Sequence, residues 1–160
     1  LANNVKVGEN RVISGDVLTG QHIDEDGALG FYHTNVTVIE EGKEQEFLGW
    51  MMPGLDKFSA SKTFLSWLMP SKKYALNANM HGEERAYVMT GEYEKVLPMD
   101  IYPTQLIKAC MIEDIELMEN LGIYEVSPED VALCEFVCTS KIEVQSIIRH
   151  GLDLVSKENS

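Results

Sequence analysis

The stretch SKIEVQSIIRHGLDLV, residues 140–155, carries the clearest folding pattern in the chain. Ser140 and Glu143 have the spacing of a capping box, which predicts a helix that begins directly after them. The apolar residues of the stretch recur at helical spacing and form one stripe, made of Val144, Ile147, Ile148, Gly151, Leu152 and Val155. A short amphipathic helix is stable only when its apolar face is buried, so we expect it to pack on other elements.

Further helices are predicted before this stretch. Pro103 suits a first helical position, Gly122 is a stop signal, and Ser127 followed by Pro128 is typical of a helix start. The apolar positions that share a face are Leu106, Ile107, Cys110 and Met111, and then Ile115, Met118 and Leu121. We therefore expect residues 98–160 to form a helical C-terminal domain.

Residues 1–97 are rich in glycine and in short β-branched runs, which indicates strands and turns. The predicted strands are residues 11–15, 17–18, 35–40, 46–50, 73–76 and 85–89, the third and fourth forming a hairpin around Gly42. Residues 51–71 are expected to be a long loop with one helical turn at 63–68. The fold class that follows is α+β, with a β-rich domain at 1–97 and the helical domain at 98–160.

Composition excludes several classes of protein. The 160 residues are 44% hydrophobic and 24% charged, which suits a folded globular chain and excludes a disordered or collagen-like one. No run approaches the roughly 20 apolar residues of a membrane span. The net charge of -13 disfavours nucleic acid and anionic lipid as partners. Three cysteines, an odd number, disfavour a disulfide framework.

Catalytic and metal-binding patterns are weak. The four histidines show no metal-ligand spacing, and no nucleotide-binding glycine motif is present. Cys134 and Cys138 have the spacing of the last two cysteines in the ferredoxin run C-x2-C-x2-C-x3-C-P. The earlier ligand positions hold Pro128 and Val131, and Thr139 replaces the closing proline, so a metal site is not expected. Two cysteines four apart on a helix are more often small core residues.

Leu97-Pro98 stands where Cys-Pro would close another such run. Its earlier cysteine positions hold Tyr87, Thr90 and Tyr93. Both cluster-binding runs are therefore absent, since neither has the four thiolates that a cluster needs, although the surrounding residues keep the shape of such segments. At most, Cys134 and Cys138 are remnants of cluster positions.

Several segments together resemble a known family. They are NRVISGDVLTG (10–20), VIEEG (38–42), GW (49–50), PGLDKFS (53–59), MDIYPT (99–104) and EDVALCEFVC (129–138). In combination they are similar to the C-terminal part of the A component of the Na+-translocating NADH:quinone oxidoreductase. Leu1 is not a methionine and the tail is polar, so we interpret the chain as the C-terminal piece of a longer polypeptide, cut or processed before Leu1.

The resemblance implies a peripheral component on the cytoplasmic face of the bacterial inner membrane, within a respiratory complex that couples NADH oxidation and quinone reduction to sodium export. It also implies a soluble-ligand-binding β-grasp domain followed by a helical domain. That helical domain would resemble a ferredoxin scaffold without clusters, as in the C component of the related Rnf complex. The chain would carry no cofactor itself, since NADH and quinone are substrates of the whole complex.

Three functions remain open from the sequence. The first is a structural and docking role toward the rest of the A component and the membrane subunits, by means of Phe47, Trp50, Met51, Met52, Phe58 and Trp67, which are otherwise core residues. The second is a quinone-binding or small-ligand-binding module, for which Tyr32, His33, Trp50 and Phe58 are candidates. The third, a free-standing electron carrier, is disfavoured by the two-cysteine count. No catalytic residue is predicted, so the fragment alone is not expected to be an enzyme.

Overall fold

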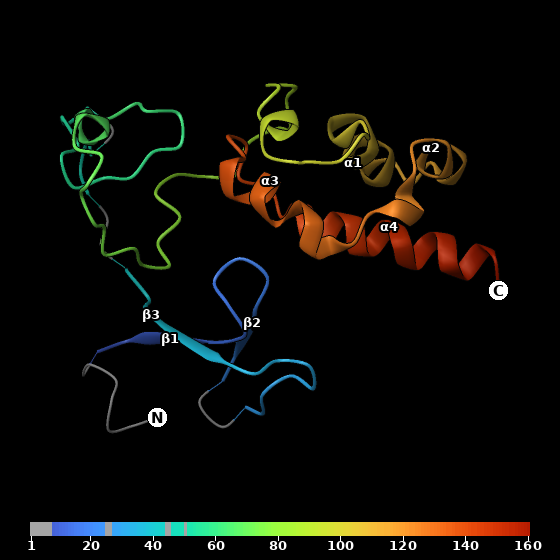
Figure 1. Ribbon diagram of the computed structural model, residues 1–160, viewed down its shortest axis with the longest axis horizontal. Helices are drawn as coiled ribbons and strands as arrows, with labels where there is room; N and C mark the ends of the chain where they lie inside the picture. The colour runs from blue at the N-terminus through green and yellow to red at the C-terminus, as the bar shows by residue number, and fades with distance from the viewer. Residues whose placement is uncertain (1–7, 25–26, 44–45, 50) are drawn as a thin grey trace. The chain divides into compact units, whose positions relative to one another are not determined.

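The computed structural model describes residues 8–24, 27–43, 46–49 and 51–160 (Figure 1). The chain divides into two compact units, residues 1–82 and residues 83–160. The first contains a three-stranded sheet and a short 3-10 helix, and the second contains the α-helices. This mixed architecture agrees with the expected α+β class.

The sheet of the first unit is antiparallel, with the order β2-β1-β3. Its strands are β1 (Asn10–Ser14), β2 (Gln21–Ile23) and β3 (Val36–Glu40). The central strand β1 pairs Val12 with Val38 and with Ile23, so β-branched side chains meet across both ladders. The predictions of strands at 11–15 and 35–40 are confirmed. Strand β2 was not anticipated, because it has only three residues.

The predicted strand at Val17 and Leu18 is wrong, because these residues form a turn. The carboxylate of Asp16 accepts hydrogen bonds from the backbone N–H groups of Leu18 and Thr19, at 2.7 and 2.9 Å. The bonds from Thr19, and next that from Leu18, hold the pKa of Asp16 below its usual value. A local side-chain bond of this kind competes with strand pairing, and here it reverses the chain between β1 and β2.

The segment between residues 46 and 82 contains no strand among its described residues. The predicted strand at 46–50 is wrong for residues 46–49, which form a turn, and Trp50 lies outside the described residues. The predicted strands at 73–76 and 85–89 are also wrong, since neither run pairs with the sheet. Short β-prone runs become strands only where a neighbouring strand offers hydrogen bonds. The helical turn predicted at 63–68 is confirmed as the 3-10 helix η1 (Leu65–Leu68).

The second unit is built around one hydrophobic core. Its α-helices are α1 (Pro103–Met111), α2 (Ile115–Asn120), α3 (Ala132–Val137) and α4 (Val144–Glu158), and its 3-10 helices are η2 (Tyr93–Lys95), η3 (Ile123–Glu125) and η4 (Pro128–Val131). Helix α4 contacts α1, α2, α3, η3 and η4, so it is the element on which the others pack. Its residues Val144, Ile148, Gly151 and Val155 are buried, as the stripe predicts.

Local polar groups decide where these helices begin. The Asp114 carboxylate accepts from the N–H of Leu117 at 3.0 Å and starts α2. Gly122, with φ of 84°, directly follows the C-cap of α2 and ends this helix, as predicted. The Asp130 carboxylate accepts from the backbone N–H of Ser127 at 2.9 Å, which confirms the predicted helix start at Ser127.

The capping box predicted at Ser140 is wrong. The N-cap of α4 is Glu143, so Ser140 lies before the cap position, and its buried hydroxyl instead donates to the carbonyl oxygen of Ala86 at 3.1 Å. A carboxylate from another helix caps α4 instead: Oε2 of Glu135 accepts from the N–H of Gln145 at 2.9 Å. This cap is a tertiary contact and has no local sequence signature.

The division between the units falls between Gly82 and Glu83, whereas the sequence suggests a boundary between residues 97 and 98. The reason is that Tyr93 and Leu97 are 3% and 6% exposed and belong to the core of the helical unit. Residues 83–97 therefore pack with the helices, although their composition is turn-rich.

Gly151 allows α4 to approach α1 closely. A Cβ at this position would lie 2.7 Å from Sγ of Cys110 and 2.9 Å from Cδ1 of Ile123. We predict that Gly151→Ala destabilises the helical unit by about 1–3 kcal/mol through overpacking, although alanine is the better helix former. Urea unfolding followed by helical circular dichroism measures the effect. The matched control, Ser156→Ala on the exposed side of α4, is expected to be neutral, and an equally neutral Gly151→Ala would contradict the packing argument.

Candidate functional site

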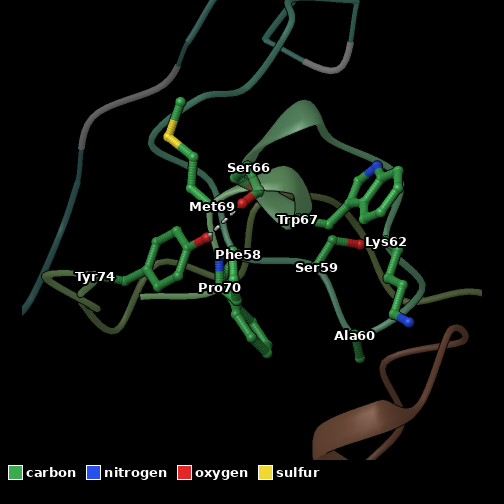
Figure 2. A pocket seen from close by; sticks show the side chains of 9 residues that line it. All are labelled: Phe58, Ser59, Ala60, Lys62, Ser66, Trp67, Met69, Pro70 and Tyr74. Atoms are coloured by element: carbon green, nitrogen blue, oxygen red, sulfur yellow. Dashed lines mark hydrogen bonds between the residues drawn. The ribbon is translucent and has the colours of Figure 1, made fainter. Parts of the chain in front are cut away.

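A pocket of about 300 Å³ lies in the loop segment of the first unit, which we define as residues 46–82 (Figure 2). Its lining is largely apolar and aromatic and consists of Phe58, Ser59, Ala60, Lys62, Ser66, Trp67, Met69, Pro70 and Tyr74. Figure 2 shows Trp67 and Lys62 on one side and Tyr74, Phe58 and Pro70 on the other. A concave, apolar site with a few polar groups is the usual form of a small-molecule or partner-binding pocket.

The 3-10 helix η1 positions the pocket wall. Ser66 is buried and its hydroxyl donates to the carbonyl oxygen of Lys57, which ties η1 to the preceding loop. The next residue, Trp67, is 53% exposed at the rim. The rings of Phe58 and Tyr74 meet edge to face with centroids 5.7 Å apart. The pocket thus has one wall made of the Phe58 and Tyr74 rings and an exposed indole opposite it.

Lysine side chains hold the loops around the pocket. The Lys57 ammonium pairs with Glu46, donates to the carbonyl oxygen of Gly49 at 2.9 Å and lies 5.7 Å from the centre of the Phe64 ring. Lys72 pairs with Asp56. Exposed ion pairs contribute little stability individually, so these contacts shape the loop more than they stabilise it.

The residues predicted from the sequence to bind a ligand do not lie together in the described structure. Phe58 lines the pocket, whereas Tyr32 and His33 do not, and Trp50 lies outside the described residues. Nδ1 of His33 lies 2.6 Å from Oγ of Ser14, and this same oxygen accepts from the N–H of Gly30 at 2.9 Å. His33 therefore supports the loop between β2 and β3.

Tyr32 is 89% exposed and packs edge to face on Phe31, with ring centroids 4.9 Å apart. It contributes to an exposed aromatic pair and does not line the pocket around Phe58. Sequence reasoning missed Tyr74 as a pocket residue because it interpreted residues 73–76 as a strand. Met69 and Pro70 were missed because a loop has no periodicity that marks an inward face.

The large apolar residues of the loop segment are exposed to solvent and are not packed in a core. Phe47 is 91% exposed and Met51 is 65% exposed, and Met52, Phe58 and Trp67 are exposed as well. The core alternative for these five residues is therefore wrong, because the described residues of the loop segment form no sheet or helix face large enough to cover them. Trp50 is not among the described residues.

The three cysteines lie in the helical unit, and all are free and buried. Burial raises the pKa of Cys110 and of Cys134 to about 11, so both are protonated thiols at neutral pH. The hydroxyl of Tyr93 donates to Sγ of Cys138 at 2.9 Å. Within the described part of the chain, no three His, Cys, Asp or Glu side chains are grouped so that they could hold a metal ion. The described helices also include none long and apolar enough to cross a membrane.

No protein-family model matches the chain. Similar curated proteins carry the name of the A component of the Na(+)-translocating NADH-quinone reductase. The one from Shewanella denitrificans is 44% identical over 99% of this chain, and the one from Rhodopirellula baltica is 48% identical over 92% of it. The chain covers 36% and 33% of these two relatives, so it spans about a third of their length. The resemblance drawn from the sequence segments is confirmed.

The buried thiols make stability depend on pH. Because the folded-state pKa of Cys110 and Cys134 is raised from about 9 to about 11, the folded chain binds their protons more tightly than the unfolded chain does. Their contribution is complete below pH 9 and is lost as the pH rises toward 11. We predict that the urea midpoint of the helical signal falls from pH 9 upward and that the Cys110→Ala, Cys134→Ala double variant declines less between pH 9 and 10. Equal declines, or rapid labelling of native thiols at pH 8, would contradict this.

Proposed function

We propose that this chain is the C-terminal part of the A component of a Na+-translocating NADH-quinone reductase and serves there as a structural and docking piece. The observation that carries the proposal is its identity of 42–48% with proteins of that name, over nearly its whole length. The complete complex would be an oxidoreductase that couples NADH oxidation and quinone reduction to sodium export. The chain would act as one peripheral piece on the cytoplasmic face of the inner membrane.

The finer fold belongs to the same proposal. We infer that the first unit derives from a β-grasp domain and the second from a ferredoxin scaffold without clusters. The three-stranded antiparallel sheet is compatible with a reduced β-grasp core. The two ferredoxin-spaced runs, 87–97 and 128–138, both contribute residues to the core of the helical unit, which supports the second inference.

Exposed apolar side chains support the docking role. In the loop segment they are Phe47, Leu48, Met51, Met52, Leu55, Phe58, Leu65, Trp67, Leu68, Met69, Leu76 and Met80. Soluble monomers seldom expose so many large apolar residues on one short segment, and such surfaces mark interaction sites. We propose that the remainder of the A component and the membrane subunits cover them. A net charge of -13 favours attachment through protein and not through anionic lipid.

Membranes that contain the complex without its A component provide the test. We predict that the chain binds them and that Phe47→Ser with Met51→Ser weakens binding at least about tenfold, since buried anchors carry most of the energy of an interface. The matched control is Ile112→Ser, a residue 68% exposed in the helical unit. Equal binding to protein-free anionic liposomes would exclude docking through protein contacts. NADH-dependent quinone reduction by the chain alone would show that it is more than a docking piece.

A quinone-binding module is the second candidate, and the pocket around Phe58 is the observation that favours it. A quinone ring could lie between Phe58 and Trp67, with Lys62 as a hydrogen-bond donor at the rim. In a Trp50→Phe background, quenching of Trp67 fluorescence by a water-soluble quinone measures this binding. Quenching that is lost in Phe58→Ala and retained in Tyr32→Ala would favour this alternative.

A further inference from the structure

The two ferredoxin-spaced runs, 87–97 and 128–138, predict which positions should lie together in space, and this can be compared with the structure. In two-cluster ferredoxins, the fourth cysteine of each run binds the cluster that the other run surrounds. One cluster would therefore use positions 87, 90 and 93 of the first run with Cys138 of the second. The other would use positions 128, 131 and 134 with Leu97. We call these two sets of positions crossed, because each takes three positions from one run and the fourth from the other. Residues so far apart in the sequence come together only through the fold.

Side chains of the first crossed set meet in the structure. The hydroxyl of Tyr93 donates to Sγ of Cys138 at 2.9 Å, across 45 residues of sequence. The ring of Tyr87 stacks on Tyr93 with centroids 5.8 Å apart and an interplanar angle of 23°. Three of the four positions, 87, 93 and 138, are thus in one contiguous contact.

Burial shows that this contact fills the interior. Tyr93 is 3% exposed and Cys138 is 8% exposed. Burial, and next the hydrogen bond to Cys138, raise the pKa of Tyr93, so the phenol stays neutral and remains a donor. Two phenol rings and one thiol occupy the space here, so this set supplies one sulfur where an iron–sulfur cluster needs four thiolates.

The second crossed set is also filled. Leu97, Val131 and Cys134 all belong to the same hydrophobic core and are 6%, 1% and 0% exposed. Burial raises the pKa of Cys134 to about 11, which disfavours the thiolate form that would bind a metal. Neither set of positions fits an iron–sulfur cluster with the residues present.

We propose that the stacked tyrosines and Cys138 occupy the place of a [4Fe–4S] cluster, and that the backbone retains a latent four-thiolate site at positions 87, 90, 93 and 138. The Tyr93–Cys138 hydrogen bond joins the two runs where iron would join them. The proposal rests on the ferredoxin-like fold proposed for the helical unit and is independent of the docking role. Failure of the test below would leave the docking experiment unaffected.

The test restores the missing ligands in the full 160-residue chain. The triple variant Tyr87→Cys, Thr90→Cys, Tyr93→Cys is incubated anaerobically with sulfide and equal amounts of ferrous and ferric iron, which together match the charge of a [4Fe–4S]2+ core. Each thiol releases its proton as its sulfur binds iron. We expect visible charge-transfer absorbance and about four iron atoms for each chain, the number in one cluster.

The matched control adds Cys138→Ser to the triple variant. We expect the absorbance to be lost or to decay within a single desalting step, whereas adding Cys134→Ser should leave it in place. A folded triple variant that binds no cluster overturns the proposal. A cluster that needs Cys134 and not Cys138 overturns the crossed pairing.

If the triple variant does not fold, a double-mutant cycle on Tyr93 and Cys138 tests whether their side chains interact as proposed. Tyr93→Phe removes the donor and Cys138→Ala removes the acceptor, and their effects on the urea midpoint are compared singly and together. We expect the double variant to lose clearly less than the sum of the two single losses. Additive losses would show that the two side chains do not meet and would overturn the proposal.

Discussion

The close contact between α4 and α1 at Gly151 is the constraint on which the helical unit depends. Helix α4 contacts α1, α2, α3, η3 and η4, and at the middle of its buried face Gly151 leaves room for Cys110 and Ile123. The same approach removes the Cys110 thiol from water and raises its pKa. The close packing of α4 and the burial of the Cys110 thiol therefore both depend on the absence of a side chain at Gly151.

The sequence predicted those parts of the fold that are encoded locally. The apolar stripe of α4, Pro103 at the start of α1 and the stop at Gly122 are patterns within a few residues, and all three appear in the structure. The cap of α4 by Glu135 was not predictable, because it crosses from another helix. The runs 73–76 and 85–89 have β propensity but no partner strand, so propensity alone misled.

The candidate pocket shows the same limit for a site. Phe58 was predictable as an aromatic residue beside turn signals, but its partners Trp67 and Tyr74 come together only through the fold of η1 and the loops around it. The two units also differ in what they leave exposed. Exposed large apolar side chains are denser in residues 46–82 than in the helical unit, which exposes several of its own, Ile112 and Phe136 among them, and carries most of the acidic residues. This difference in density is the reason why we propose the docking contacts in the first unit.

Whether side chains alone complete the helical core is tested most directly by unfolding the native chain before and after anaerobic incubation with iron and sulfide. The urea midpoint of the helical circular dichroism signal is the quantity to compare. Our account predicts a colourless protein and the same midpoint in both samples, because tyrosine, leucine and valine fill the cluster positions. A higher midpoint together with stable visible absorbance that disappears in Cys134→Ser would contradict it.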